Sequence, residues 1–326
     1  MNFVAILVAL LLDQARPASG ASVVHVAMRS WVSWSGRNFD AGQMQHAWLA
    51  WCVAVLVPSA AVLSVYWVLA HAAGWPLAVA WNMVVLYFTL GFRQFSHHFT
   101  EIRDALEAGD EARARVLLAS WQRVDANGLV RNEIVRQVVE QSVIAAHRHV
   151  FGVLAWFSVL AVLGLGPVGA VLYRLSEFVP RYWLRENEAG VRPVSATLRQ
   201  VAASVWQWVD WLPARITAMG FAVVGSFEDA IDSWRTYERG GQVDNDGVIL
   251  ASTAGAINLC LRPAGPGAHS GAAAIPIDVG DSRAAIAQVG QEPEIGHLRT
   301  VVGLVWRTVV MWMILLALLT LARLLG

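Results

Sequence analysis

Long apolar runs alternate along this sequence with polar segments that carry arginine. The clearest run covers 301–325, and its charges, Arg307 and Arg323, lie near its ends. A helix that crosses the hydrocarbon core of a bilayer needs roughly 20 apolar residues, and an arginine near its end can reach the lipid–water interface. The pattern predicts a transmembrane helix here.

Four further apolar runs also predict membrane segments. The run at 3–12 has no basic residue before it, which disfavours a cleaved signal peptide and favours a short, retained membrane helix. The runs at 47–70 and 75–92 are separated by a short turn and predict a membrane hairpin. The run at 150–173 is interrupted by GLGPVG, so both a full crossing and two half-helices stay open.

The polar segments differ from one another in their periodicity. Charged residues recur at helical spacing in 93–149 and predict an extramembrane helical lobe, with a break where Asp110 would cap the next helix. The segment 201–227 is semi-apolar and rich in tryptophan, and we expect Pro213 to break it. The segment 240–300 is rich in Gly, Ala and Pro, which predicts a long loop region.

These patterns predict an all-α, polytopic membrane protein with about five membrane segments and a helical extramembrane lobe. The expected divisions are 1–92 for the N-terminal membrane segments and hairpin, 93–149 for the lobe, 150–235 for a membrane segment plus an interfacial broken helix, 236–300 for the Gly/Ala/Pro-rich loop region with partial order around 249–262, and 301–326 for the C-terminal transmembrane helix.

The positions of the arginines bear on topology. Those in 13–46 and 93–149 favour the cytoplasmic side of a bacterial inner membrane, because cytoplasmic loops carry an excess of basic residues. A single crossing at 150–173 would send 174–300, which is also rich in arginine, to the opposite side. We therefore favour a re-entrant segment or a second crossing near 201–227.

Composition narrows the class of protein. Hydrophobic residues make up 56% and charged residues 15%, whereas soluble domains carry about 25% charged residues. The 16 tryptophans against 5 tyrosines suit a membrane–water boundary, and the expected partner is the lipid bilayer. Basic and acidic residues number 24 each, so no nucleic-acid partner is expected. Cys52 and Cys260 lack metal or redox spacing and are interpreted as structural thiols.

The most distinctive local string is DWLPAR at 210–215. Asp210 and Arg215 flank a proline inside an apolar segment, where isolated charges are unfavourable unless they pair or bind a ligand. One interpretation is a clamp for an anionic substrate at the membrane surface. The other is a structural ion pair that fixes a broken helix.

Two histidine pairs are weaker candidates. His97 or His98 could meet Glu101 across one helical turn, either as a metal pair or as a solvated helix start. His147 and His149 share no helical face and could contact phosphate or lipid headgroups, or pack beside the membrane.

The string at 210–218 resembles the "N-x-x-PARLTA" signature of the cobinamide synthase family (CobD/CbiB), the membrane proteins of cobalamin synthesis. Other segments resemble further motifs of that family in the same order: 105–115 resembles "aL-x-x-GD-x-x-AR", Arg123-Val124-Asp125 resembles "GRDT", Tyr173-Arg174 resembles "YR", and 253–261 resembles "AMAGALGVRLGG". The resemblance spans nearly the whole chain.

The resemblance implies an ATP-dependent amide ligase that joins an aminopropanol-type amine to a corrinoid carboxylate, that of adenosylcobyric acid. It implies ATP and Mg²⁺ as cofactors, because phosphate oxygens and carboxylates together hold magnesium. The acids would orient Mg²⁺ or the amine, and the arginines would hold phosphate in a bidentate manner. The candidates are Glu140, Asp125 and Asp210 as catalytic residues, and Arg123, Arg215, His147 and His149 as substrate-binding residues; no metal-ligand set is assigned.

Some family positions differ in this chain. Where the family has "ESVAENTVDG", the chain reads EQSVIAAHRHVFG, so Glu140 matches but His147 and Arg148 occupy positions of the Glu-Asn pair. The loss of acidic positions predicts a degenerate active site. The chain is also similar to the AmpE family, which implies the alternative of a non-catalytic membrane regulator or sensor linked to cell-wall or β-lactamase signalling.

Overall fold

The computed structural model describes residues 2–15, 23–72, 74–122, 126, 128–188, 190, 194–241, 244–261 and 290–325. Within these ranges the regular structure is helical apart from one isolated bridge between Leu259 and Gln291, which confirms the all-α fold class. The chain forms two compact units. Unit 1 comprises Met1–Gly91, Arg148–Pro213 and Ala317–Gly326, and unit 2 comprises Phe92–His147 and Ala214–Leu316.

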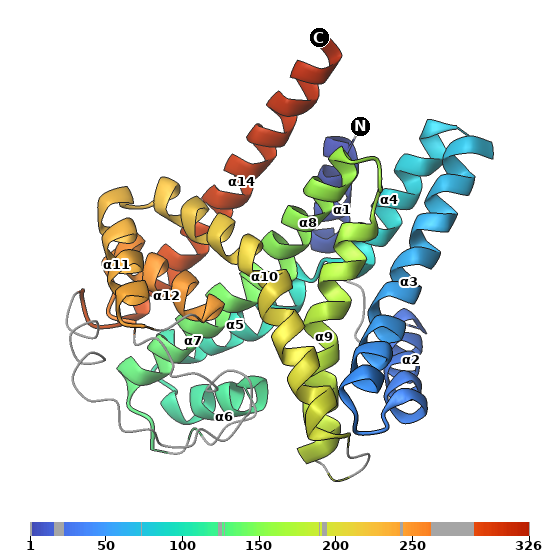
Figure 1. Ribbon diagram of the computed structural model, residues 1–326. Coiled ribbons are helices and arrows are strands. Elements are labelled where there is room, and N and C mark those ends of the chain that lie inside the picture. Colours follow the sequence, from blue (N-terminus) through green and yellow to red (C-terminus); the bar gives the residue numbers. More distant parts are fainter. Residues whose placement is uncertain are drawn as a thin grey trace. The chain divides into compact units, whose positions relative to one another are not determined.

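Unit 1 contains the long helix α3, which lies beside α2, α4 and α9 (Figure 1). Its elements are α1 (Asn2–Ala15), α2 (Val23–Phe39), α3 (Met44–Ala72), α4 (Trp75–Thr89), most of the π-helix η1 (His147–Phe151), α8 (Gly152–Val162), α9 (Val168–Glu188) and the first part of α10 (Ala196–Val224). α3 packs against α2, α4 and α9, and α8 packs along α9. The core of the unit therefore lies where α2, α3, α9 and α10 meet.

Small side chains on α3 explain this close packing. Ala47, Ala50 and Ala54 recur every three or four residues, lie on one helical face and are fully buried. Such small residues let helix backbones approach each other in membrane proteins. Trp183 of α9 fills the same core, and its indole N–H donates to the carbonyl of Val32 at 3.2 Å, so its polar group is also satisfied.

Unit 2 consists of two helix groups joined through α7. Its elements are α5 (Phe92–Glu107), α6 (Glu111–Gln122), α7 (Arg131–Ala146), the last part of α10, α11 (Phe227–Arg239), α12 (Asn245–Ile257) and most of α14 (Ile295–Leu325). α7 packs against α5 and α6, which precede it in the chain, and against α12, which follows it. α11 and α12 lie side by side (Figure 1).

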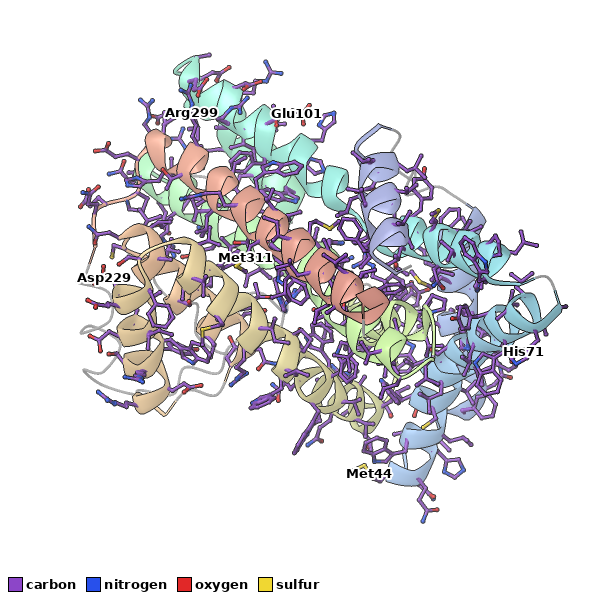
Figure 2. All side chains as sticks on the ribbon, turned by 90° about the horizontal axis from the view of Figure 1, so that it is seen from above. Met44, His71, Glu101, Asp229, Arg299 and Met311 are labelled. Atoms are coloured by element: carbon purple, nitrogen blue, oxygen red, sulfur yellow. The ribbon has the colours of Figure 1, made fainter. Side chains whose placement is uncertain are left out.

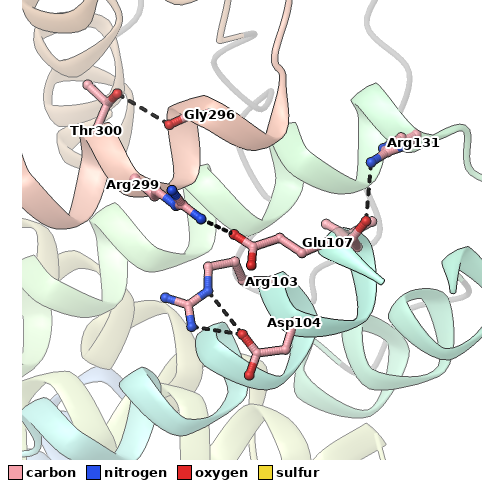
Figure 3. Close-up of polar contacts among 8 residues, drawn as sticks. Arg103, Asp104, Glu107, Arg131, Gly296, Arg299 and Thr300 are labelled. Atoms are coloured by element: carbon pink, nitrogen blue, oxygen red, sulfur yellow. Dashed lines mark hydrogen bonds and ion pairs between the residues drawn. The ribbon is translucent and has the colours of Figure 1, made fainter. Parts of the chain in front are cut away.

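Polar contacts at the helix ends hold unit 2 together. The carboxylate of Asp110 accepts the backbone N–H of Arg113 at 2.9 Å, which confirms the predicted cap between α5 and α6. Figure 3 shows Arg299 of α14 reaching Glu107 of α5, with a separation of 2.9 Å between nitrogen and oxygen. The Arg103–Asp104 ion pair in the same view lies on exposed surface, where such pairs contribute little to stability.

Helices long and apolar enough to cross a membrane occur at Met44–Ala72, Arg131–Val162 and Ile295–Ala322, with shorter apolar helices at Phe3–Asp13 and Trp75–Thr89. The chain is an all-α membrane protein. Many large apolar side chains on α3 and α14 are exposed, as expected for surfaces that face lipid rather than water. Met44 and His71 mark the two ends of α3 in Figure 2.

One predicted membrane segment is shifted along the chain. Helical structure continues from α7 through η1 into α8 and ends at Val162, so the long apolar helix covers Arg131–Val162 instead of 150–173. The prediction of an interruption at GLGPVG is correct, since α9 begins only at Val168. The charged residues Glu133, Arg136 and Glu140 lie within this helix, where Arg136 pairs with both carboxylates.

Two other local predictions are wrong. α10 runs without a break through Pro213, because α-helices in apolar surroundings tolerate proline when neighbouring groups satisfy the freed carbonyl. Residues 245–257, placed in a loop region with only partial order around 249–262, form the helix α12, which is almost wholly buried. Its start is marked by Asp244, whose carboxylate accepts the backbone N–H of Gly247 at 3.1 Å. The remaining part of that predicted loop, 262–289, lies outside the described residues.

Gly255 sits where α12 crosses α11. A Cβ atom at this position would overlap the backbone carbonyl of Asp229, which cannot move as a flexible side chain could. The absence of a side chain therefore sets the distance between α11 and α12.

We expect Gly255→Ala to lower the free energy of unfolding by about 1–3 kcal/mol, because the added methyl group must push two packed helices apart. The measurement is denaturant-induced unfolding of the detergent-solubilised protein. Gly303→Ala in α14 is the matched control, since its Cβ would meet nothing within 4 Å and should leave stability unchanged or slightly raised. Equal behaviour of the two variants would show that Gly255 is not a packing constraint.

Candidate functional site

α10 carries both charged residues of the DWLPAR string and directs them to different sides. Five residues along an α-helix correspond to a rotation of about 140°, so Asp210 and Arg215 project from different faces. Asp210 belongs to unit 1 and Arg215 to unit 2. Each has a partner in its own unit, and these partners define two polar clusters.

In unit 1, Asp210 is buried beneath Tyr173. The Tyr173 hydroxyl donates to Oδ1 of Asp210 at 2.8 Å, and both residues are at most 1% exposed. Gly152 makes this contact possible, because a Cβ atom there would overlap the Tyr173 ring. The neighbouring Trp156 indole donates to the carbonyl of Val209 at 2.9 Å and ties α8 to α10. Two segments that carried the family resemblance, YR and DWLPAR, thus meet in space.

A basic cluster lies on α9 and η1 in the same unit. Arg174 donates to Glu177 at 3.0 Å, and Arg181 also pairs with Glu177, whose side chain is almost fully buried. Arg148 lies over the ring of Trp206 with 6.0 Å to the ring centroid. Burial lowers the pKa of Arg174 to about 10, so this guanidinium stays a cation at neutral pH.

In unit 2, Glu140 is held by an arginine one turn earlier on α7. Arg136 Nη1 donates to Glu140 Oε1 at 2.6 Å and also pairs with Glu133. Glu140 is 3% exposed, so its charge depends on this guanidinium. Glu140 was predicted from the sequence, whereas Arg136 and Glu133 were not. The signal was present as acid–arginine spacings of three and four residues, which place the groups on one helical face.

Arg215 bridges α10 to α12 in unit 2. Its Nη1 donates to Oδ1 of Asn245 at 2.5 Å, and Nη2 lies 3.6 Å from a carboxylate oxygen of Glu238. Ser252 of α12 donates to the carbonyl of Ala218 at 2.8 Å. The segments that resemble the family's PARLTA and AMAGAL motifs therefore pack against each other.

The two predicted histidines have separate surroundings. His147 is fully buried, with Nδ1 2.9 Å from the Thr217 hydroxyl, so packing explains it better than contact with lipid headgroups. His149 lies near the basic cluster of unit 1. His97 and Glu101 form an exposed pair at 3.2 Å, and no three His, Cys, Asp or Glu side chains converge on a metal position within the described residues.

Arg123 and Asp125 lie outside the described residues. For the other candidates, the structure shows that Glu140, Arg215 and His147 belong to unit 2 and that Asp210 and His149 belong to unit 1. Their assignment as catalytic or substrate-binding residues stays a prediction.

Comparison with known proteins supports the likeness seen in the motifs. A family model described as "CobD/Cbib protein" matches residues 6–292. The chain is 28% identical over 277 residues to cobalamin biosynthesis protein CobD of Stutzerimonas stutzeri (strain A1501), covering 84% of this chain and 82% of that protein. It is 29% identical over 195 residues to the protein of the same name from Chromobacterium violaceum, covering 58% and 59% of the two chains. No solved structure matches the chain.

We expect Arg136→Gln to lower the free energy of unfolding by about 3–5 kcal/mol, because it leaves the buried Glu140 carboxylate without its cation. Combining it with Glu140→Gln should restore much of the loss, since the buried carboxylate is then removed, and Glu133, which also loses Arg136, is partly exposed to water. Arg103→Gln removes an exposed ion pair and should change stability by less than about 0.5 kcal/mol. Denaturant unfolding in detergent measures all three. A double variant no more stable than Arg136→Gln would contradict this account.

The Tyr173–Asp210 contact can be measured with a double-mutant cycle of Tyr173→Phe and Asp210→Asn. Removing the hydroxyl should lower the free energy of unfolding by about 1.5–3 kcal/mol, because a hydrogen bond to a charged, buried group is lost. The two changes should be coupled by at least about 0.5 kcal/mol. Strict additivity would mean that the hydroxyl does not act through the carboxylate.

Proposed function

Because this chain belongs to the CobD/Cbib protein family, we propose that it acts in cobalamin biosynthesis and forms an amide bond between adenosylcobyric acid and an aminopropanol-type amine. The observation that carries the proposal is the family match across residues 6–292, which includes the segments that build both polar clusters. The named relatives, each called cobalamin biosynthesis protein CobD, support the same pathway.

The proposed reaction has defined chemical requirements. The amine nitrogen must attack the carbonyl carbon of an activated corrinoid carboxylate, lose a proton and displace a leaving group. ATP with Mg²⁺ would supply the activation. The described carboxylates Glu140 and Asp210 are each held by a named partner, so a magnesium ion would take much of its shell from phosphate oxygens and water, as it commonly does.

The clusters suggest how the chain's own residues would contribute. Arg215 is anchored by Asn245 at one nitrogen and could present other N–H groups to an anionic part of the substrate. Glu140 would orient the amine, with Arg136 holding it in the ionised form. Asp210 would act as a positioning residue through Tyr173. Arg123 and Asp125 stay part of the proposal as a phosphate-binding and a catalytic residue.

The proposed location is the bacterial inner membrane, with several crossings. The three long and two shorter apolar helices support it, as does the excess of arginine in the segments next to them.

The proposal predicts complementation. In a bacterium that lacks its own CobD/Cbib-family enzyme, the wild-type gene should restore growth that depends on newly made cobalamin. Arg215→Ala and Asp210→Asn should reduce growth strongly, while Arg103→Ala, which alters an exposed ion pair, should support full growth. Immunoblots of membranes check that every variant accumulates equally. Failure of the wild-type gene, despite normal accumulation, would reject the synthase role and favour a non-catalytic membrane regulator.

A further inference from the structure

Unit 1 contains a cavity of about 280 Å³ that the proposed amide chemistry does not use. Its walls come from the C-terminal parts of α2 and α9 and from the segment that precedes α10. None of its lining residues belongs to the family-like segments or to the predicted catalytic and substrate-binding residues. One water molecule occupies about 30 Å³ in the liquid, so the cavity has room for a compound of roughly ten non-hydrogen atoms.

Charged side chains of both signs line this cavity without pairing across it. Arg37 comes from α2, Asp40 directly follows that helix, and Glu186 comes from α9. Among these three residues, all within the described part of the chain, no guanidinium nitrogen lies within 4.0 Å of a carboxylate oxygen. Opposite charges that are held apart around a cavity match a ligand that carries both an anionic and a cationic group.

Two of these groups are held by the backbone and keep further hydrogen-bonding capacity. Oδ1 of Asp40 accepts the N–H of Gly42 at 3.1 Å, and Oδ2 accepts the N–H of Ser195 at 2.6 Å. Nε of Arg37 donates to the carbonyl of Ser33 at 3.4 Å, which leaves the two terminal NH₂ groups of the guanidinium for a ligand. Arg37 is exposed and Glu186 half-buried, so the cavity is open to water at these side chains.

A glycine and a tryptophan shape the inner wall of the cavity. A Cβ atom at Gly36 would lie 2.9 Å from the indole nitrogen of Trp183 and 3.6 Å from Cγ1 of Val194, and all three residues line the cavity. Trp183 is 1% exposed and fixed by its hydrogen bond to the carbonyl of Val32, so it has little freedom to move aside. The missing side chain at Gly36 therefore keeps this space open.

We propose that the cavity binds a free α-amino acid. The α-carboxylate matches the paired N–H groups of Arg37, and the α-ammonium matches the carboxylates of Glu186 and Asp40. The aromatic rings of Tyr182 and Trp183 offer apolar surface to the side chain of the ligand. Because two carboxylates and one guanidinium line the cavity, a ligand of net negative charge, such as a phosphate ester, is disfavoured.

The size of the cavity separates this proposal from the proposed reaction. A space for roughly ten non-hydrogen atoms suits an amino acid and is far too small for a corrinoid. The residues proposed for the amide chemistry, Glu140, Asp210 and Arg215, do not line it. The site therefore adds a small-molecule ligand to those that the proposed function requires.

The test uses the full-length protein in detergent, and the probes are the twenty common L-amino acids at millimolar concentration. We expect one or a few with apolar side chains to raise the midpoint of thermal unfolding, because a ligand that binds only the folded state stabilises it. Calorimetric titration then gives the affinity. The N-acetyl and amide derivatives of the best ligand, which lack the ammonium and the carboxylate respectively, should bind at least about 10-fold more weakly.

Three results of this titration would overturn the proposal. The first is that no amino acid changes the unfolding midpoint. The second is that a derivative binds as tightly as its parent amino acid, because the cavity would then not recognise both charges. The third is that ethanolamine, an amino alcohol without a carboxylate, binds as tightly as the best amino acid, which would assign the cavity to the amine of the proposed reaction.

Variants locate the binding site. Arg37→Gln should weaken binding about 10–100-fold, because it removes charge-assisted hydrogen bonds to the α-carboxylate. Arg29→Gln is the matched control, since Arg29 is exposed on the same helix but does not line the cavity, and it should bind as the wild type does. Gly36→Ala should also weaken binding, because its methyl group occupies the cavity wall while every charge stays in place.

The unfolding midpoint without ligand shows that each variant folds. Equal weakening by Arg37→Gln and Arg29→Gln would mean that the amino acid binds elsewhere and would overturn the proposal. Unchanged binding by both Arg37→Gln and Gly36→Ala would do the same.

Discussion

Charged groups inside an apolar helical protein must be compensated where they lie, and this constraint organises both units. Glu140 is compensated by Arg136, Glu177 by Arg174 and Arg181, and Asp210 accepts a hydrogen bond from Tyr173. Without these contacts, burying each carboxylate would cost several kcal/mol of hydration free energy, on the order found for buried ions, and no attractive interaction would offset it. The pairs of Glu140 and Glu177 form within one helix, whereas the Tyr173–Asp210 contact requires α9 and α10 to pack against each other.

Small residues allow the partners to reach each other. Gly152 leaves room for the Tyr173 ring on its way to Asp210, and Gly255 lets α12 approach the backbone of α11. α12 in turn supplies Asn245 to Arg215. The segments that resemble the family motifs are thus coupled by packing: glycines set the helix distances, and the distances decide which polar side chains meet.

One departure from the family motifs coincides with an irregular turn of the structure. The turn where the family has acidic and amide residues carries His147, Arg148 and His149 and forms the π-helix η1. Arg148 of this turn and Arg174 and Arg181 of α9 all act electrostatically on His149. Glu140 and Arg215 in unit 2 keep the groups on which the proposed amide chemistry depends.

Apolar length alone determined that the chain is an all-α membrane protein, because an unbroken run of such residues has no stable place in water, and motif order identified the family. Individual candidates such as Glu140, Asp210 and Arg215 also followed from the sequence, since charges in apolar segments stand out. Tertiary structure alone decided the partners that are distant in sequence. Tyr173 meets Asp210 across 37 positions, Arg215 meets Asn245 across 30, and α12 is a buried helix despite its loop-like composition. These outcomes depend on packing between segments distant in sequence, and local periodicity carries no information about which distant side chain will satisfy a buried charge.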